Sequence, residues 1–289
     1  MKTLNVVGCG KVGKALARLW TRHGVFQVLS ILNRTLQSGE AAAEFVGAGR
    51  AVRGFAELAK ADLVMISAAD EAIVDCCRGL CIAGALGRGT IVFHCSGSLA
   101  SAVLEPARSQ GAWIASVHPV KSFADPAMAA GSFPGTFCAV EGDPQACAVL
   151  RAAIHGCDGI PFAIEPRLKT IYHAATVFAS NYLVALMEIG LRCLEKSGVA
   201  RETALQILCP LAAGTVANVG ELGPERALTG PIARGEASVV AKQCEALGPW
   251  DAMIQDLYKS LGRVALELAA AQGTAAPEAL GEVRRLLEQ

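Results

Sequence analysis

Apolar residues follow two different periodicities along the chain, and the change between them falls near residue 165. Up to that point, short apolar runs of strand length alternate with segments in which apolar residues recur at helical spacing. We expect strands over residues 4–7, 28–32, 63–68, 90–95, 113–117, 137–141 and 161–164. Strands that alternate with helices in this way predict a largely parallel sheet with helices on both faces.

After residue 165 the pattern is helical throughout. Glycine and proline residues divide it into expected helices over residues 166–196, 201–219, 231–246, 249–271 and 276–288. The third of these is expected to begin at Pro231, since proline is favoured in the first turn of a helix. The sequence therefore predicts an α/β Rossmann-type nucleotide-binding domain at residues 1–165, followed by an all-α helical domain at residues 166–289.

The first expected strand runs directly into the motif G-x-G-x-x-G, and a helix-patterned segment follows it. In a dinucleotide-binding turn, Gly8 would make the tight turn, Gly10 would let a pyrophosphate approach the backbone, and Gly13 would let the helix pack closely. The free N–H groups of the helix would then face the phosphate charge. The sequence therefore predicts a dinucleotide site, and its contacts are also expected to include Lys11, Val12, Ala68 and Ala69. The alternative is a glycine-rich structural turn.

The end of the second expected strand indicates which dinucleotide is bound. NAD sites usually place a carboxylate there to hold the ribose 2′-hydroxyl, whereas this chain has Asn33, Arg34 and Thr35. A carboxylate would repel a 2′-phosphate, but the planar guanidinium of Arg34 can pair with it and the hydroxyl of Thr35 can donate to it. We therefore predict NADP(H) as the cofactor. The alternative is that Arg34 is a solvated loop cation.

The first helix after residue 165 places polar residues on one face of a mostly apolar sequence. At about 100° per residue, Lys169, His173, Thr176 and Ser180 lie within about 60° of arc. Because a long apolar helix is expected to be buried, this polar face needs partners or a cavity. We interpret it as facing a substrate cleft, where Lys169 would donate a proton as hydride reaches a C=O or C=N carbon, and His173 would share proton transfer. The alternatives are a face toward solvent and an internal hydrogen-bond network.

Further candidates follow the carboxyl ends of the expected strands, where open α/β sheets bind ligands. Ser96 and His118 are expected to take part in catalysis. Asp70 is expected to cap the helix that starts near Glu71. The residues expected to bind substrate are Gly97, Lys121, Thr176, Ser180, Asn181 and Arg234.

Composition excludes several classes of function. The 26 Lys and Arg residues equal the 26 Asp and Glu residues, and no basic patch suggests a nucleic-acid partner. The 11 cysteines lack the spacing of a metal site, so no metal is expected. The first strand leaves no room for a signal peptide, and the apolar segment at residues 174–194 contains charged residues. We therefore expect a soluble cytoplasmic protein without a membrane segment.

Together these residues resemble the superfamily of pyrroline-5-carboxylate reductases, β-hydroxyacid dehydrogenases and 6-phosphogluconate dehydrogenases. Within it, the chain is most similar to a little-characterised group of predicted oxidoreductases with an N-terminal Rossmann-like half and a C-terminal helical half of unassigned function. The β-hydroxyacid dehydrogenases use a lysine and, one turn later, an asparagine; the resemblance maps Lys169 onto that lysine, while His173 replaces the asparagine. The matching segments lie at residues 8–13, 33–35, 94–98, 118–123, 169–181 and 229–235.

The residues and the resemblance predict an NADPH-dependent oxidoreductase that reduces a small carboxylate-bearing ketone. A 2-keto acid similar to ketopantoate is the expected substrate, with Lys169 as proton donor. Two alternatives stay open: a cyclic-imine reductase of the pyrroline-5-carboxylate type, and a non-catalytic NADPH-binding sensor or scaffold. The helical half has more apolar surface than a small bundle covers, which together with the resemblance predicts a homodimer formed through that half.

Overall fold

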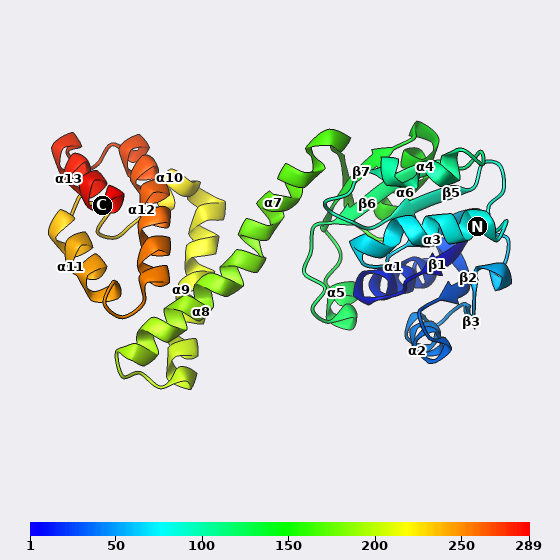
Figure 1. The fold of residues 1–289 in the computed structure, drawn as a ribbon, viewed down its shortest axis with the longest axis horizontal. Helices are drawn as coiled ribbons and strands as arrows, with labels where there is room; N and C mark the ends of the chain where they lie inside the picture. The colour runs from blue at the N-terminus through cyan, green and yellow to red at the C-terminus, as the bar shows by residue number, and fades with distance from the viewer. The chain divides into compact units, whose positions relative to one another are not determined.

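The computed structural model describes residues 1–289, which form two compact units, Met1–Asn181 and Tyr182–Gln289. The first unit contains an eight-stranded sheet in the order β3-β2-β1-β4-β5-β6-β7-β8 (Figure 1). Its strands are β1 (Lys2–Val7), β2 (Phe26–Leu32), β3 (Arg50–Val52), β4 (Leu63–Ile66), β5 (Ile91–His94), β6 (Trp113–Pro119), β7 (Phe137–Gly142) and β8 (Ile160–Ala163). Each strand expected from the sequence is present, and β3 is an additional short one.

Strand direction changes once across the sheet. Strands β1 to β6 are parallel to their neighbours, β7 runs antiparallel to β6, and β8 runs parallel to β7. In the antiparallel pair, Glu141 of β7 lies opposite Ser116 of β6. The reversal therefore brings a carboxylate beside the middle of β6.

Helices cover both faces of the sheet. The helices of this unit are α1 (Lys11–Arg22), α2 (Leu36–Val46), α3 (Asp70–Ile82), α4 (Glu105–Arg108), α5 (Pro126–Gly131), α6 (Pro144–His155) and α7 (Lys169–Ala179), with short 3₁₀ turns η1 (Phe55–Glu57), η2 (Ser101–Leu104) and η3 (Pro166–Leu168). Leu63 and Met65 belong to the core under α1, α2, α5 and α6, whereas Val64 and Ile66 belong to the core under α3 and α4. This two-sided burial explains why the strands are continuous apolar runs.

The second unit is helical, so the predicted fold class, a Rossmann-type α/β half followed by a helical half, is confirmed. Its elements are α8 (Asn181–Lys196), α9 (Arg201–Leu222), α10 (Pro224–Ala227), α11 (Ala237–Leu247), α12 (Ala252–Gln272) and α13 (Pro277–Glu288). Its core is small and joins Val240 of α11, Leu266 of α12 and Leu287 of α13.

Two expectations about the helical half are wrong. The helix expected over residues 166–196 is interrupted at Ser180, whose φ of −120° and ψ of −72° separate α7 from α8. Residues 231–235 form turns instead of the start of a helix, because Gly230 and Gly235 adopt φ of 95° and 69°. The first unit also extends beyond residue 165 and contains α7.

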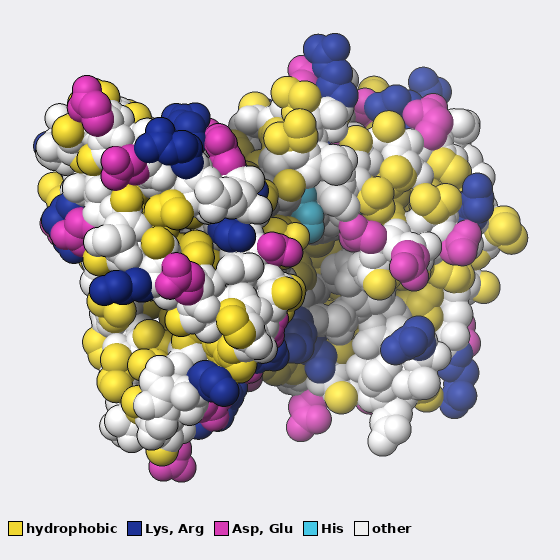
Figure 2. Space-filling model, turned by 60° about the vertical axis from the view of Figure 1, so that its left-hand side comes forward, with side chains coloured by type: hydrophobic (Ala, Val, Ile, Leu, Met, Phe, Trp, Pro, Cys, Tyr) yellow, Lys and Arg dark blue, Asp and Glu magenta, His cyan; other side chains and the backbone are white.

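Two long apolar stretches are exposed, although the helix that starts at residue 166 was expected to be buried. In residues Pro166–Lys196 and Arg201–Leu222, only 6% of the most apolar window is buried. By length and composition alone, both stretches could cross a membrane, although one or two such helices are weak evidence of that. Val184, Leu211 and Val216 are among the exposed side chains, and Figure 2 shows many hydrophobic side chains at the surface.

Candidate functional site

The glycine-rich loop after β1 has no space for side chains at two of its three glycines. Gly8 has a φ of 72°, and a Cβ there would lie 2.7 Å from atoms of Ala68. A Cβ on Gly13 would collide with the hydroxyl of Ser67, which donates to the carbonyl of Gly8 over 2.8 Å. A Cβ on Gly10, in contrast, would stand 3.9 Å from the nearest protein atoms. Gly8 and Gly13 therefore serve close packing, while Gly10 leaves open space at the N-terminus of α1.

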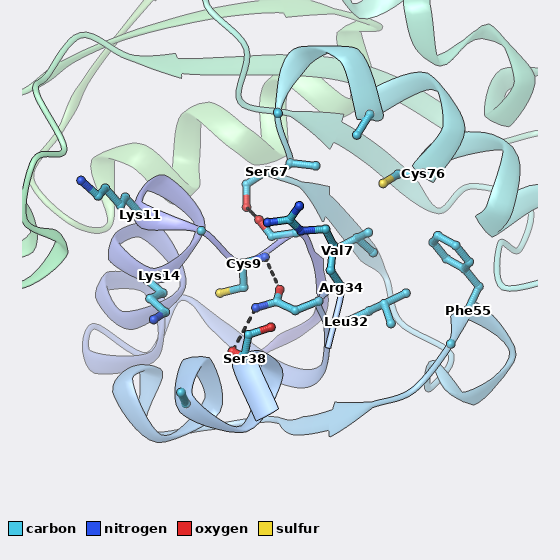
Figure 3. Close-up of a pocket in the computed structure, with 18 of the residues that line it drawn as sticks. Val7, Cys9, Lys11, Lys14, Leu32, Arg34, Ser38, Phe55, Ser67 and Cys76 are labelled. Carbon is cyan, nitrogen blue, oxygen red and sulfur yellow. Dashed lines mark hydrogen bonds between the residues drawn. The ribbon is translucent and has the colours of Figure 1, made fainter. Parts of the chain in front are cut away.

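A cavity of about 1080 Å³ lies over this loop (Figure 3). It is large for a small-molecule site, since such pockets usually measure about 300–1,000 Å³. Its lining comes from the ends of β1, β2, β3 and β4 and includes Gly8, Cys9, Gly10, Lys11, Lys14, Asn33, Arg34, Ser38, Arg53, Phe55, Ser67, Ala68, Ala69 and Cys76. The carboxyl ends of four neighbouring strands thus contribute to one pocket.

Most of the predicted cofactor contacts line this cavity, but three do not. Val12 packs against the hydrophobic core, and Gly13 lies against Ser67. Thr35 caps α2, because its hydroxyl accepts from the backbone N–H of Ser38 over 3.2 Å. Sequence reasoning missed Lys14, which directly follows the glycine motif in α1. It also missed Ser38, Arg53 and Phe55, which come from segments without a recognised motif.

Asn33 links the glycine-rich loop to α2. Its Oδ1 accepts from the backbone N–H of Cys9 over 2.7 Å, and its Nδ2 donates to the carbonyl of Ser38 over 3.0 Å (Figure 3). Both ends of the amide are thereby committed to the protein. Asn33 shapes the pocket, and the cationic side chains on its lining are Lys11, Lys14, Arg34 and Arg53.

Lys169 lies inside the first unit with its ammonium fully engaged. The residue is 1% exposed, and its Nζ donates to the carbonyl oxygen of Ser96 over 3.0 Å, to Ser116 Oγ, and to Glu141 Oε1 over 3.5 Å. Burial lowers the pKa of Lys169, and the charge of Glu141 opposes that shift. An ammonium has three N–H donors, so none remains for a ligand. The interpretation of Lys169 as facing an open cleft is therefore wrong. Its side chain belongs instead to an internal hydrogen-bond network, the alternative that the sequence left open.

The carboxylate of Glu141 is bound from its other side by a serine. Ser101 donates to it through its backbone N–H over 2.8 Å and through its hydroxyl over 2.7 Å. A buried ion pair is tolerated when further hydrogen bonds satisfy both partners. The network of Lys169, Glu141, Ser101 and Ser116 therefore fixes the first turn of α7 to β6, β7 and η2.

A second cluster lies at the carboxyl ends of β5 and β6 and joins Gly97, His118, Tyr172 and His173. His118 Nδ1 and the hydroxyl of Tyr172 are 2.7 Å apart, and the rings of His118 and His173 are 5.7 Å apart. A Cβ on Gly97 would lie 2.8 Å from His118 Nε2 and would collide with the ring of His173. The sequence therefore identified three members of this cluster, and it missed Tyr172 because an aromatic residue in an apolar helix is typical of a core.

Burial keeps His118 uncharged near neutral pH. Desolvation lowers the pKa of its imidazole to about 4, and the nearby His173 and Lys169 add to that effect. Burial likewise raises the pKa of Tyr172 to about 12. The pair is therefore a neutral phenol and a neutral imidazole.

Ser96 is committed to the protein and connects two loops. Its hydroxyl donates to the carboxylate of Asp70 over 2.8 Å and accepts from the backbone N–H groups of Ser98 and Leu99. Asp70 also accepts from the hydroxyl of Ser98 over 2.7 Å. Its carboxylate makes no capping hydrogen bond, so the expectation that Asp70 caps its helix is wrong. Asp70 instead ties the loop after β5 to α3, directly after Ala69 in the cofactor-pocket lining.

The other expected substrate contacts have partners of their own or lie in the open. The Thr176 hydroxyl donates to the carbonyl of His173, and Lys121 Nζ donates to the carbonyl of Ser132. Arg234, in the helical unit, is paired with Glu236 over 2.7 Å. Ser180 and Asn181 are exposed where α7 meets α8. No group of three or more His, Cys, Asp or Glu side chains is placed to hold a metal ion.

Residues 2–119 match the Rossmann-like domain family, and residues 136–265 match a domain of unknown function, DUF2520. Domain-family models therefore match both halves of the chain. This combination confirms the resemblance to the little-characterised two-part group. No curated protein matches the chain.

Solved structures share the fold of this chain over nearly its whole length. A putative NADP oxidoreductase of Bacteroides fragilis is 22% identical with a TM-score of 0.74, covering 91% of this chain and 97% of its own. A Thermotoga maritima protein is 25% identical with a TM-score of 0.73, covering 93% and 99%. The pyrroline carboxylate reductase of Plasmodium falciparum, solved with NADP bound, is 13% identical with a TM-score of 0.59, covering 99% and 98%.

Proposed function

We propose that this protein is an NADPH-dependent oxidoreductase that reduces a small carboxylate-bearing ketone. The observation that carries the proposal is the cavity over Gly10, which combines an open helix N-terminus with the cationic side chains of Lys14, Arg34 and Arg53. The open space at Gly10 suits a pyrophosphate, and the cations suit a 2′-phosphate. When bound, NADPH would supply the hydride. The NADP-bound relative of the same fold supports the assignment.

We expect Arg34→Ala to weaken NADPH binding by about 10- to 100-fold while changing NADH binding by less than about threefold, because only NADPH carries a 2′-phosphate for the guanidinium. Isothermal titration of both cofactors measures the change. Arg78→Ala is the matched control, since Arg78 is an exposed α3 cation paired with Asp75 and does not line the pocket. Equal losses for NADPH and NADH would contradict the assignment of Arg34.

The reduced oxygen would be held at the cluster of Gly97, His118 and His173. Reduction of a ketone places negative charge on oxygen, which a hydrogen-bond donor stabilises. The sequence pattern favours Lys169 as that donor, but its N–H groups are committed to Ser96, Ser116 and Glu141. We therefore propose His118 as the donor beside the reacting oxygen. Lys169 would instead hold the loop after β5 in place through its hydrogen bond to the carbonyl of Ser96.

The test of the function is NADPH oxidation, followed by its absorbance, with a panel of linear and branched 2-keto acids and cyclic imines. We expect turnover with a 2-keto acid. A cyclic-imine substrate is the second candidate, and the burial of Lys169 favours it, since a protonated imine needs no proton from the protein. Turnover of imines alone would change the substrate class. Tight NADPH binding without any turnover would replace the enzyme with a sensor or scaffold.

We propose that a second copy of the chain covers the apolar faces of α8 and α9. Exposed apolar area of this extent is unusual on a soluble monomer, and Val184, Leu211 and Val216 are 70%, 63% and 57% exposed. Such a homodimer would be a soluble, cytoplasmic protein without membrane insertion or nucleic acid. Light scattering after gel filtration in buffer without detergent should give twice the chain mass of 29.9 kDa. A monomer, or solubility only in detergent, would contradict this proposal.

A further inference from the structure

The hydroxyl of Tyr172 contacts Nδ1 of His118, whereas Gly97 lies beside the other ring nitrogen, Nε2. The two atoms, Tyr172 Oη and His118 Nδ1, are 2.7 Å apart. A phenol is a stronger acid than a neutral imidazole, and an imidazole nitrogen is a stronger base than a phenol oxygen. The hydroxyl of Tyr172 is therefore the donor and Nδ1 the acceptor. The proton of the neutral ring consequently sits on Nε2.

Nε2 of His118 lies next to Gly97, the glycine of the loop after β5. His118 Nε2 lies 2.8 Å from where a Cβ of Gly97 would stand. A Cβ there would also collide with the ring of His173, so the glycine lets the loop after β5 pack closely against both imidazoles. His118 itself is only partly buried. Phe162 packs edge-on against Tyr172 with ring centroids 6.1 Å apart, and it holds the phenol from the side of β8.

We propose that Tyr172 is a positioning residue that fixes His118 as its Nε2–H tautomer and passes a proton through the imidazole to the reduced substrate oxygen. This inference rests on the proposed function and adds the source of the proton. It assigns to Tyr172 and His118 together the task that the sequence suggested for Lys169.

The proton transfer balances with water as the final source of the proton, which leaves hydroxide in the solvent. Hydride adds to the carbonyl carbon, and the C=O π electrons move to oxygen to give an alkoxide. The Nε2–H bond of His118 breaks as the alkoxide O–H bond forms, while the O–H bond of Tyr172 breaks as the Nδ1–H bond forms. The phenolate then takes the Nδ1 proton back as Nε2 is reprotonated from water. Overall, one proton passes from water to the product.

The surroundings of His118 favour this neutral relay over an imidazolium donor. The titratable groups near His118 are Tyr172, His173 and Lys169 from α7 and Asp70 from α3. Burial lowers its pKa to about 4, so the imidazolium is scarce at neutral pH. The pKa of Tyr172, about 12, still makes its phenol a stronger acid than an ordinary alcohol product. A neutral imidazole can donate a proton from Nε2 while Nδ1 accepts one from Tyr172, so the relay needs no imidazolium.

The tautomer can be measured without any substrate. The chain has five histidines, and selective ¹⁵N-histidine labelling with long-range ¹H–¹⁵N correlation distinguishes Nε2–H from Nδ1–H rings. His118→Gln assigns the His118 signal. We expect a pure Nε2–H tautomer in the full-length protein and a mixture of tautomers in Tyr172→Phe. Tyr258→Phe is the matched control, because it removes a phenol whose hydrogen bond goes to Gln243 in the helical unit.

Kinetics supply the second measurement, with NADPH and the 2-keto acid that is turned over. Tyr172→Phe should lower kcat by about 10- to 100-fold, within the usual range for a lost proton-transfer partner, with an unchanged KM for NADPH. Its kcat should also lose the dependence on D₂O that a two-proton relay gives. Tyr258→Phe should behave as wild type.

The outcomes separate this inference from the proposed function. An Nδ1–H tautomer in the wild type, or an unchanged tautomer in Tyr172→Phe, overturns the inference whatever the enzyme reduces. A wild-type kcat in Tyr172→Phe also overturns it. If no 2-keto acid is turned over while the tautomer depends on Tyr172, the proposed function fails and the positioning role of Tyr172 survives.

Discussion

Replacing Lys169 with methionine is expected to lower the free energy of unfolding of the first unit by about 3–5 kcal/mol, the usual cost of removing one partner of a buried ion pair. The change leaves the carboxylate of Glu141 buried without its cation. It also removes the donor that holds the carbonyl of Ser96 and the hydroxyl of Ser116. Urea denaturation followed by circular dichroism measures the loss.

A double-mutant cycle shows whether the loss comes from the pair itself. Glu141→Gln alone should also destabilise the fold, and Lys169→Met combined with Glu141→Gln should cost less than the sum of the two. Lys121→Met is the matched control, because Lys121 is a partly exposed lysine that donates to one carbonyl. Additive costs would mean that Lys169 and Glu141 act independently, contrary to the structure.

Gly10→Ala is expected to weaken NADPH binding by about 100-fold, which corresponds to about 3 kcal/mol, with little change in stability. The backbone of Gly10 has a φ of −80°, which alanine adopts freely, and a Cβ there would meet no protein atom closer than 3.9 Å. The methyl group would instead occupy the space assigned to the pyrophosphate. Isothermal titration and thermal unfolding of the same sample measure both quantities.

Gly13→Ala provides the matched comparison, because its Cβ would collide with the hydroxyl of Ser67. We expect it to lower the melting temperature, with weaker cofactor binding as a consequence. A destabilised Gly10→Ala variant, or one that binds NADPH as tightly as wild type, would contradict the separation of roles within the loop.

The sequence predicted the sheet and the glycine-rich loop well because both depend on local patterns. Most positions of the buried strands are apolar, and the loop has glycines where positive φ and close approach require them, as at Gly8. β3 was missed because its three residues are too short to show a period. Arg53 and Phe55 were missed for a similar reason, since they line the pocket from an irregular segment that only the sheet order brings near the loop.

The polar face of α7 shows that a periodic sequence pattern does not predict how deeply a side chain is buried. The spacing of Lys169 and His173 correctly indicated neighbouring positions on a helix, but it contained no information on depth. Lys169 is buried because Glu141 lies 28 residues away on an antiparallel strand, which no local pattern reveals. The apolar pattern of residues 166–196 predicted burial, whereas the structure leaves most of that stretch exposed.

The buried Lys169 network also bears on how much of the chain the first unit needs for its full stability. Its hydrogen bonds join residues up to 73 positions apart, and the cation comes from the first turn of a helix that follows the last strand. On the ribosome, β7 therefore places a carboxylate in the interior before the residue that neutralises it has been synthesised. A fragment cut at residue 165 would contain every strand of the sheet and still leave the buried carboxylate of Glu141 without its cation. The hydrogen-bond network of the first unit is therefore complete only once α7, which carries Lys169, has been synthesised.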